Sequence, residues 1–98
     1  MLYPTTIWKF RLALETLDHQ SVTVLAMPTG ARVLSAAFQA SDLQIWAAVN
    51  PEAKLQNRRF AVVGTGLPAA PEIITGRFVG TVFFQGLVFH VFDLGSVF

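Results

Sequence analysis

The sequence contains no cysteine, which excludes disulfide bonds and thiolate metal sites. This absence fits a reducing compartment such as the cytoplasm. No stretch approaches the roughly 18–20 uninterrupted apolar residues that a membrane-spanning helix needs. The first residues also lack the basic region, apolar run and small-residue cleavage site of a secretory signal. We therefore expect neither a membrane span nor a signal peptide.

Excess charge of either sign is also missing. Seven Lys and Arg against six Asp and Glu leave a net charge of +1. Proteins that bind long nucleic acids usually show a strong basic excess, because they neutralise many phosphates. This charge balance excludes an extended nucleic-acid footprint and still allows a small local patch of basic residues.

The sequence shows no motif of catalysis or metal binding. No Gly-x-Ser-x-Gly elbow occurs. The two histidines, His19 and His90, form no His-x-His or His-x3-His pair of metal ligands. His90 lies among Phe89, Val91 and Phe92, where a lone histidine is usually a satisfied core or interface residue. We expect no enzyme, no metal ion and no cofactor.

Apolar residues are abundant for a short chain. Of the 98 residues, 53% are hydrophobic, and nine are phenylalanine. A domain of this size buries only about 60–65% of the surface that its unfolded chain exposes. Residues 1–98 are therefore expected to form one β domain that hides its surplus apolar surface by assembling into a homo-oligomer, a dimer or higher.

The clearest structural pattern is the stretch Gly76–Leu94, two β-branched and aromatic runs separated by Gln85-Gly86. Runs of this kind around a two-residue turn predict a β-hairpin. Both faces of this hairpin are apolar, so each face must be covered. The turn fixes the expected cross-strand pairs: Phe84 with Leu87, Phe83 with Val88, Val82 with Phe89, Thr81 with His90, Gly80 with Val91 and Val79 with Phe92.

Five further segments show the alternation or composition of strands. Together with the hairpin they predict an all-β fold, a small antiparallel sandwich or barrel-like sheet of about seven short strands, with no convincing helix. The segments are Thr6–Leu14, Ser21–Met27, Ala31–Ala40 with strict alternation, Leu43–Val49, which pairs with it across a Ser41-Asp42 turn, and Arg58–Val63. The connections are a short arm at Met1–Thr5, a polar turn at Glu15–Gln20, a loop with one possible helical turn at Pro51–Leu55, a loop with an edge segment at Ala69–Thr75, and a tail at Gly95–Phe98.

The Gly64-Thr65-Gly66 turn resembles a phosphate-binding loop in composition alone. Such a loop needs a helix directly after its glycines, and two prolines follow in Leu67–Pro71. The turn nevertheless stands close to Arg58 and Arg59 in sequence, and guanidinium groups pair well with phosphate.

The two tryptophans, Trp8 and Trp46, have two interpretations. Each shares a strand with alternating apolar residues, which favours a place in the core, while tryptophan is also enriched at binding sites. If a small anionic ligand such as a nucleotide is bound, we expect its charge to pair with Arg58 or Arg59. Thr65 and its turn then supply backbone N–H groups, and Trp46 stacks on a base.

Six ordered blocks cover nearly the whole chain and resemble one family. The sequence is similar to short uncharacterised proteins encoded by tailed bacteriophages and prophages, which are grouped only as a domain of unknown function. The resemblance implies a phage-encoded accessory protein acting in the host cytoplasm and supplies no active-site residues. The blocks are Ile7-Trp8-Lys9-Phe10, Met27-Pro28-x-Gly30-Ala31-x-Val33-Leu34-Ser35, Leu43-Gln44-Ile45-Trp46-Ala47, Val49-Asn50-Pro51-Glu52 with Arg59-Phe60, Val63-Gly64-Thr65-Gly66-x-Pro68 and Leu87-Val88-Phe89-His90-Val91-Phe92.

Two functional hypotheses follow from these expectations. The leading one is a non-enzymatic binding protein with a counter-defence role, which occludes a host immune protein or sequesters a nucleotide signal. It rests on an analogy of size and origin. The alternative is a virion-associated structural or accessory protein.

Overall fold

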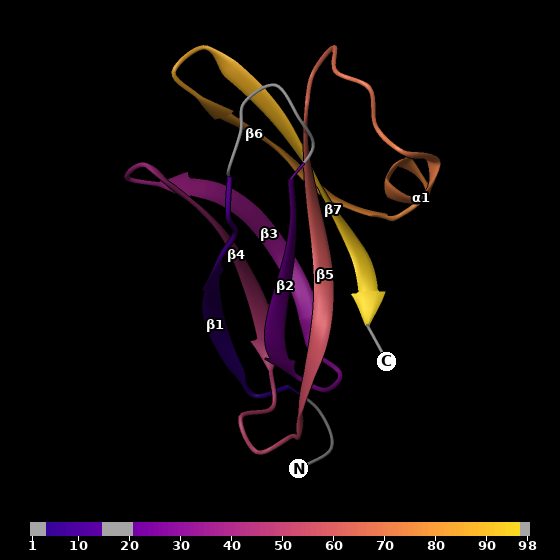
Figure 1. The fold of residues 1–98 in the computed structure, drawn as a ribbon. Coiled ribbons are helices and arrows are strands. Elements are labelled where there is room, and N and C mark those ends of the chain that lie inside the picture. The colour runs from indigo at the N-terminus through magenta and orange to yellow at the C-terminus, as the bar shows by residue number, and fades with distance from the viewer. Residues whose placement is uncertain (1–3, 15–20, 97–98) are drawn as a thin grey trace.

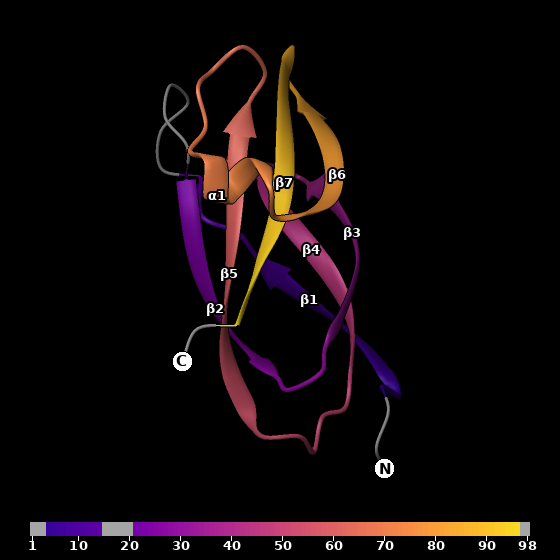
Figure 2. The same ribbon diagram turned by 90° about the vertical axis from the view of Figure 1, so that its right-hand side faces the viewer.

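Two antiparallel sheets packed face to face form the protein (Figures 1 and 2). The computed structural model describes residues 4–14 and 21–96. One sheet has three strands in the order β1-β4-β3, and the other has four in the order β2-β5-β7-β6. The all-β prediction is confirmed, in its sandwich form. The strands are β1 (Thr6–Arg11), β2 (Ser21–Pro28), β3 (Arg32–Gln39), β4 (Asp42–Val49), β5 (Leu55–Gly64), β6 (Arg77–Phe84) and β7 (Leu87–Ser96), and one short helix, α1 (Pro71–Ile74), precedes β6.

Three predictions fall wholly or partly outside the described residues. They concern the polar turn Glu15–Gln20 with His19, most of the terminal arm and the end of the tail. No helix in the part of the chain that the structure describes is long and apolar enough to cross a membrane.

The core lies between the sheets because each strand turns alternate residues inward. On β4 the inward residues Ile45, Ala47 and Val49 are fully buried, and on β5 Phe60 is. The other buried apolar residues of this cluster come from both sheets and the segments that join them: Leu12, Met27, Ala31, Leu43, Val62, Val82, Phe89 and Val91.

The predicted β6–β7 hairpin is confirmed. Gln85 and Gly86 both have positive φ, 49° and 78°, as a tight type I′ connection requires. All predicted pairs from Phe84–Leu87 to Gly80–Val91 are present. A bulge between Phe78 and Gly80 then places Phe78 opposite Phe92, so the predicted pairing of Val79 with Phe92 is wrong.

The β3–β4 hairpin is confirmed as well, with Gln39 opposite Asp42. The strict alternation predicted for Ala31–Ala40 is wrong, because the register shifts between Val33 and Ser35. The bulge brings Val33 into contact with the core together with Ala36 and Phe38.

The segment Ala69–Thr75 was predicted as a loop with an edge segment and contains α1 instead. Pro71 occupies the first turn, where its fixed φ suits a helix and its missing N–H is no loss. Ile73 is buried against Ala61 and Val63 of β5, so tertiary packing stabilises a helix that sequence propensity alone does not. Figures 1 and 2 show α1 on the outer side of the four-stranded sheet, over β5 and β7.

Other predicted boundaries differ as well: β1 ends at Arg11, three residues before the predicted Leu14. The suggested helical turn Pro51–Leu55 is a hydrogen-bonded turn, in which the Ala53 N–H donates to the Asn50 carbonyl at 3.0 Å. β5 begins at Leu55, three residues before the predicted Arg58. β7 continues to Ser96, so part of the predicted tail is paired strand.

Candidate functional site

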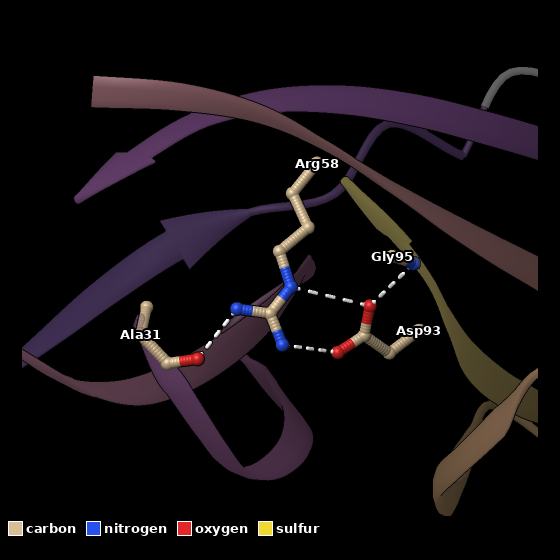
Figure 3. A network of polar contacts seen from close by, with 4 residues as sticks. All are labelled: Ala31, Arg58, Asp93 and Gly95. Atoms are coloured by element: carbon tan, nitrogen blue, oxygen red, sulfur yellow. Dashed lines mark hydrogen bonds and ion pairs between the residues drawn. The ribbon is translucent and has the colours of Figure 1, made fainter. Parts of the chain in front are cut away.

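Arg58, a predicted ligand residue, lies in a buried ion pair. Its Nη2 and Nε donate to the two carboxylate oxygens of Asp93 at 2.5 and 3.3 Å (Figure 3). Its Nη1 donates to the Ala31 carbonyl, and the Gly95 N–H donates to Asp93 at 2.9 Å. The two side chains are only 16% and 4% exposed. The positive charge of the guanidinium is therefore already paired with a carboxylate. The main role of Arg58 here is to connect β5 to β7 and to the β2–β3 turn.

The other predicted residues lie on different surfaces. Arg59 is exposed on the outer face of the four-stranded sheet, in register with Val24 of β2. Trp46 is half-buried on the outer face of the three-stranded sheet, because its neighbours Ile45 and Ala47 point into the core. The structure thus separates Trp46 from Arg58 and Arg59, and one nucleotide cannot contact the tryptophan and these arginines together.

Thr65 belongs to a small polar cluster on the outer side of the β6–β7 hairpin. Its hydroxyl lies 2.7 Å from Nε2 of His90, and the Thr81 hydroxyl lies 3.0 Å from Nδ1 of the same ring. Both ring nitrogens of His90 thus have a hydrogen-bond partner, as expected for a satisfied core or interface residue, and Thr81 lies opposite it as the hairpin register predicts.

The cluster can present hydrogen-bonding groups to a ligand. A neutral imidazole has one donor and one acceptor nitrogen, so one threonine accepts from the ring and the other donates to it. The accepting hydroxyl keeps its own proton for a further partner, and the donating hydroxyl keeps a lone pair. Both ring nitrogens of His90 meet hydroxyl groups, and among the described residues no carboxylate orients the ring as in a nucleophile–histidine–acid triad. The arrangement therefore suits recognition better than nucleophilic catalysis.

A shallow hollow of about 200 Å³ opens beside this cluster, between the glycine turn and α1. Its walls are mainly apolar, with the Thr65 hydroxyl and the His90 ring as polar groups. The lining residues are Val63, Gly64, Thr65, Gly66, Leu67, Ile74, His90 and Phe92.

Large apolar side chains are exposed on the same outer face of the four-stranded sheet as the hollow. On β6, Phe83 is 71% exposed and Phe78 is 57% exposed, with the Phe78 ring edge-on to Phe92 at 5.7 Å. Ile74 of α1 is 58% exposed. The chain therefore covers only part of the outer face of the β6–β7 hairpin, although both faces of this hairpin are apolar and were expected to be covered. Sequence reasoning could not single out these phenylalanines, because alternation marks the two faces of a hairpin and does not say which face meets the other sheet.

Among residues 4–14 and 21–96, no three His, Asp or Glu side chains cluster closely enough to hold a metal ion.

Comparison with known proteins identifies a family and no individual relative. No curated protein and no solved structure matches the chain. One family model, described as a domain of unknown function (DUF7352), matches residues 4–96. This match spans almost the whole sandwich, from the residues before β1 to the end of β7. The chain therefore belongs to the DUF7352 family.

Proposed function

We propose that this chain is a phage-encoded, non-enzymatic binding protein of the host cytoplasm that binds partners through the outer face of its β6–β7 hairpin. We call this surface the hairpin face. The observation that carries the proposal is the exposure of large apolar side chains there. The residues of the hairpin face are Phe78, Thr81, Phe83, Val88, His90 and Phe92 of the hairpin, together with the adjoining Thr65 and Ile74.

The exposed aromatic rings favour a protein partner. Buried phenylalanine removes roughly 150–250 Å² of surface from water, and contiguous apolar patches on small soluble proteins usually mark interaction sites. The polar groups of Thr65, His90 and Thr81 lie within this apolar surface. Hydrophobic contact stabilises binding of any apolar partner, whereas hydrogen bonds to these groups distinguish one partner from another.

A second copy of the chain is the first partner that we propose. Apolar strands in excess of one small core favour a symmetric dimer, in which the same face meets itself. The counter-defence role follows as the leading physiological context, in which the protein occludes a host immune protein or sequesters a nucleotide signal. Its support is the resemblance to phage-encoded proteins and the small all-β fold.

Light scattering on single variants tests the hairpin face. We expect the unaltered protein to be dimeric at micromolar concentration and Phe83→Ser to be monomeric but still folded, because Phe83 is 71% exposed in the single chain. The melting temperature of the variant should fall only by what dimerisation contributes. Val24→Ser is the matched control, since Val24 is 54% exposed on β2 of the same sheet. A monomeric unaltered protein, or equal effects of the two variants, would contradict the assignment.

The physiological role needs a separate measurement. Native mass spectrometry of the protein isolated from phage-infected cells reports its assembly, a retained host protein and a retained nucleotide together. Either retained partner supports counter-defence. Recovery in purified virions, with neither partner bound in the cell, would instead establish the virion-associated alternative.

A further inference from the structure

The outer face of the three-stranded sheet differs in character from the hairpin face. Its central strand, β4, turns Ile45 and Ala47 into the core and Trp46 outward. Directly opposite residues in an antiparallel pair share a face, so Lys9 of β1 and Ser35 of β3 flank Trp46 on either side. We call this surface the tryptophan face. By the same register it includes Ile7, Arg11, Arg32, Ala37, Gln39, Asp42, Gln44 and Ala48.

Positive charge is concentrated on the tryptophan face. Lys9, Arg11 and Arg32 stand against the single carboxylate of Asp42, a net charge of +2 on one face of a chain whose total is +1. Arg32 is exposed and has no ion-pair partner among the described residues. The pair between Arg11 and Asp42 is 3.4 Å long with side chains 71% and 50% exposed, so a phosphate can displace it at little cost.

Lys9 also keeps donors for a ligand. Its ammonium group donates one hydrogen bond, of 2.6 Å, to Gln39 across the central strand. A lysine ammonium has three donors, which leaves two for an anion.

The cations are spread along a diagonal that passes the indole. Arg11 lies opposite Gln44 at one end of β4, and Arg32 lies opposite Ala48 near the other end. With strands about 4.8 Å apart and a rise of about 3.4 Å per residue, their Cα atoms are roughly 17 Å apart, with Trp46 between them. One mononucleotide is too short to contact both Arg11 and Arg32, so a ligand that pairs with both ends of the diagonal is a strand of a few nucleotides.

The position of Trp46 itself points to a ligand. The residue lies on the solvent side of its strand and adds nothing to the packing between the sheets. A small polar or charged residue would serve as well at such an outward position. Indole rings beside cations on an open sheet are the elements with which single-stranded nucleic acids are bound: bases stack on the ring and phosphates pair with the charges.

We propose that the tryptophan face binds a short stretch of single-stranded nucleic acid. One base stacks on Trp46, and the phosphates on either side pair with Arg11, Lys9 and Arg32. A duplex does not fit this site, because its bases are already stacked on one another. The proposal goes beyond the hairpin face, which lies on the other sheet, and needs only the small local footprint that the charge balance allows.

Fluorescence anisotropy with labelled eight-residue oligonucleotides tests the proposal. We expect single-stranded DNA or RNA to bind more tightly than the same sequence as a duplex and than mononucleotides or cyclic dinucleotides. The logarithm of the association constant should fall against the logarithm of salt concentration with a slope of about −2, since each of three neutralised phosphates contributes about −0.7 on a single strand.

Three variants locate the site. Trp46→Ala should weaken binding roughly 5- to 150-fold, the equivalent of one base–aromatic stack of about 1–3 kcal/mol, and Trp46→Phe should retain most of the affinity. Arg32→Gln should reduce the salt slope by about 0.7. Arg59→Gln is the matched control, since it removes the same charge from an exposed arginine of the other sheet. Because Trp46→Ala alters a half-buried residue, thermal melting of each variant separates misfolding from lost contacts.

Several outcomes would overturn the proposal. They are no binding of single strands at low salt, equal affinity for duplex or mononucleotide, unchanged affinity in folded Trp46→Ala, and a larger effect of Arg59→Gln than of Arg32→Gln. None of them bears on the hairpin face, whose test is the oligomeric state of Phe83→Ser. The two proposals can therefore fail separately.

Discussion

Replacing Asp93 by asparagine should destabilise the fold strongly, although the two side chains have almost the same shape. The carboxylate is 4% exposed and holds the Arg58 guanidinium, which is 16% exposed. Removing one partner of a buried pair leaves the other charge without compensation, a loss of about 3–5 kcal/mol. For a domain of this length each kcal/mol lowers the melting temperature by about 4–8 °C, so we expect a fall of about 12–40 °C.

The magnitude is best measured as a double-mutant cycle in urea. Arg58→Met should also destabilise, because it leaves the Asp93 carboxylate buried with only the Gly95 N–H. The double variant Arg58→Met, Asp93→Asn should lose at least 2 kcal/mol less than the sum of the single losses, since no uncompensated charge remains; coupling of up to about 3 kcal/mol is usual for contacting groups.

An exposed ion pair provides the control for this cycle. Arg11→Gln breaks the pair with Asp42, whose side chains are 71% and 50% exposed, and should change stability by no more than about 1 kcal/mol. The reasoning would be refuted if Asp93→Asn had an effect as small as that of Arg11→Gln, or if the two single losses simply added.

Three further predictions concern stability and can be read from thermal or urea unfolding. Phe89→Ala should cost roughly 3–5 kcal/mol, because the ring is 4% exposed in the core; a change below about 1 kcal/mol would show that the hairpin packs elsewhere. Gln85→Asn should stabilise by a few tenths to about 1 kcal/mol, since asparagine adopts positive φ more readily than glutamine, and a loss of stability would contradict the turn assignment. Gly76→Ala should destabilise, because its Cβ would stand 3.0 Å from the Ile73 carbonyl oxygen, whereas Gly80→Ala meets nothing within 4 Å and should be neutral or slightly stabilising; equal effects at the two glycines would refute this contrast.

The local sequence pattern predicts the elements that depend on neighbouring residues alone, such as the β6–β7 hairpin. Gln85-Gly86 between two apolar runs determines both the turn and the pairs up to Gly80–Val91, because a two-residue turn allows one register. The register predicted from the turn is wrong beyond Gly80, where a bulge lies between Phe78 and Gly80. An isolated glycine within a strand often marks a bulge, so Gly80 was a local signal that the predicted register did not use.

Predictions that depend on distant partners were wrong, as for the segment that forms α1, or stayed open, as for the ligand-binding residues. Arg58 looks like a free cation in sequence, because Asp93 lies 35 residues away along the chain and comes within reach of Arg58 only when β5 pairs with β7. Helix α1 forms because Ile73 is buried against β5. The sequence of the helix segment alone does not indicate this packing. The outward direction of Trp46 could be predicted only as one of two alternatives, because alternation leaves open which face of a strand meets the core.

The order of the strands also has consequences for how the chain folds. Among the strand pairs of the described residues, β3–β4 and β6–β7 alone pair through tight turns. The pairs β1–β4, β2–β5 and β5–β7 join strands that are distant in the chain. Two hairpins can thus form within microseconds, while the remaining pairings require the closure of long loops and place folding in the range of milliseconds to seconds. During that interval the β6–β7 hairpin exists without the cover of α1 and of the facing sheet, with Phe83 and Phe89 both in water. Nascent chains that meet at this stage can pair through the bare hairpin, so the yield of refolding should fall as protein concentration rises.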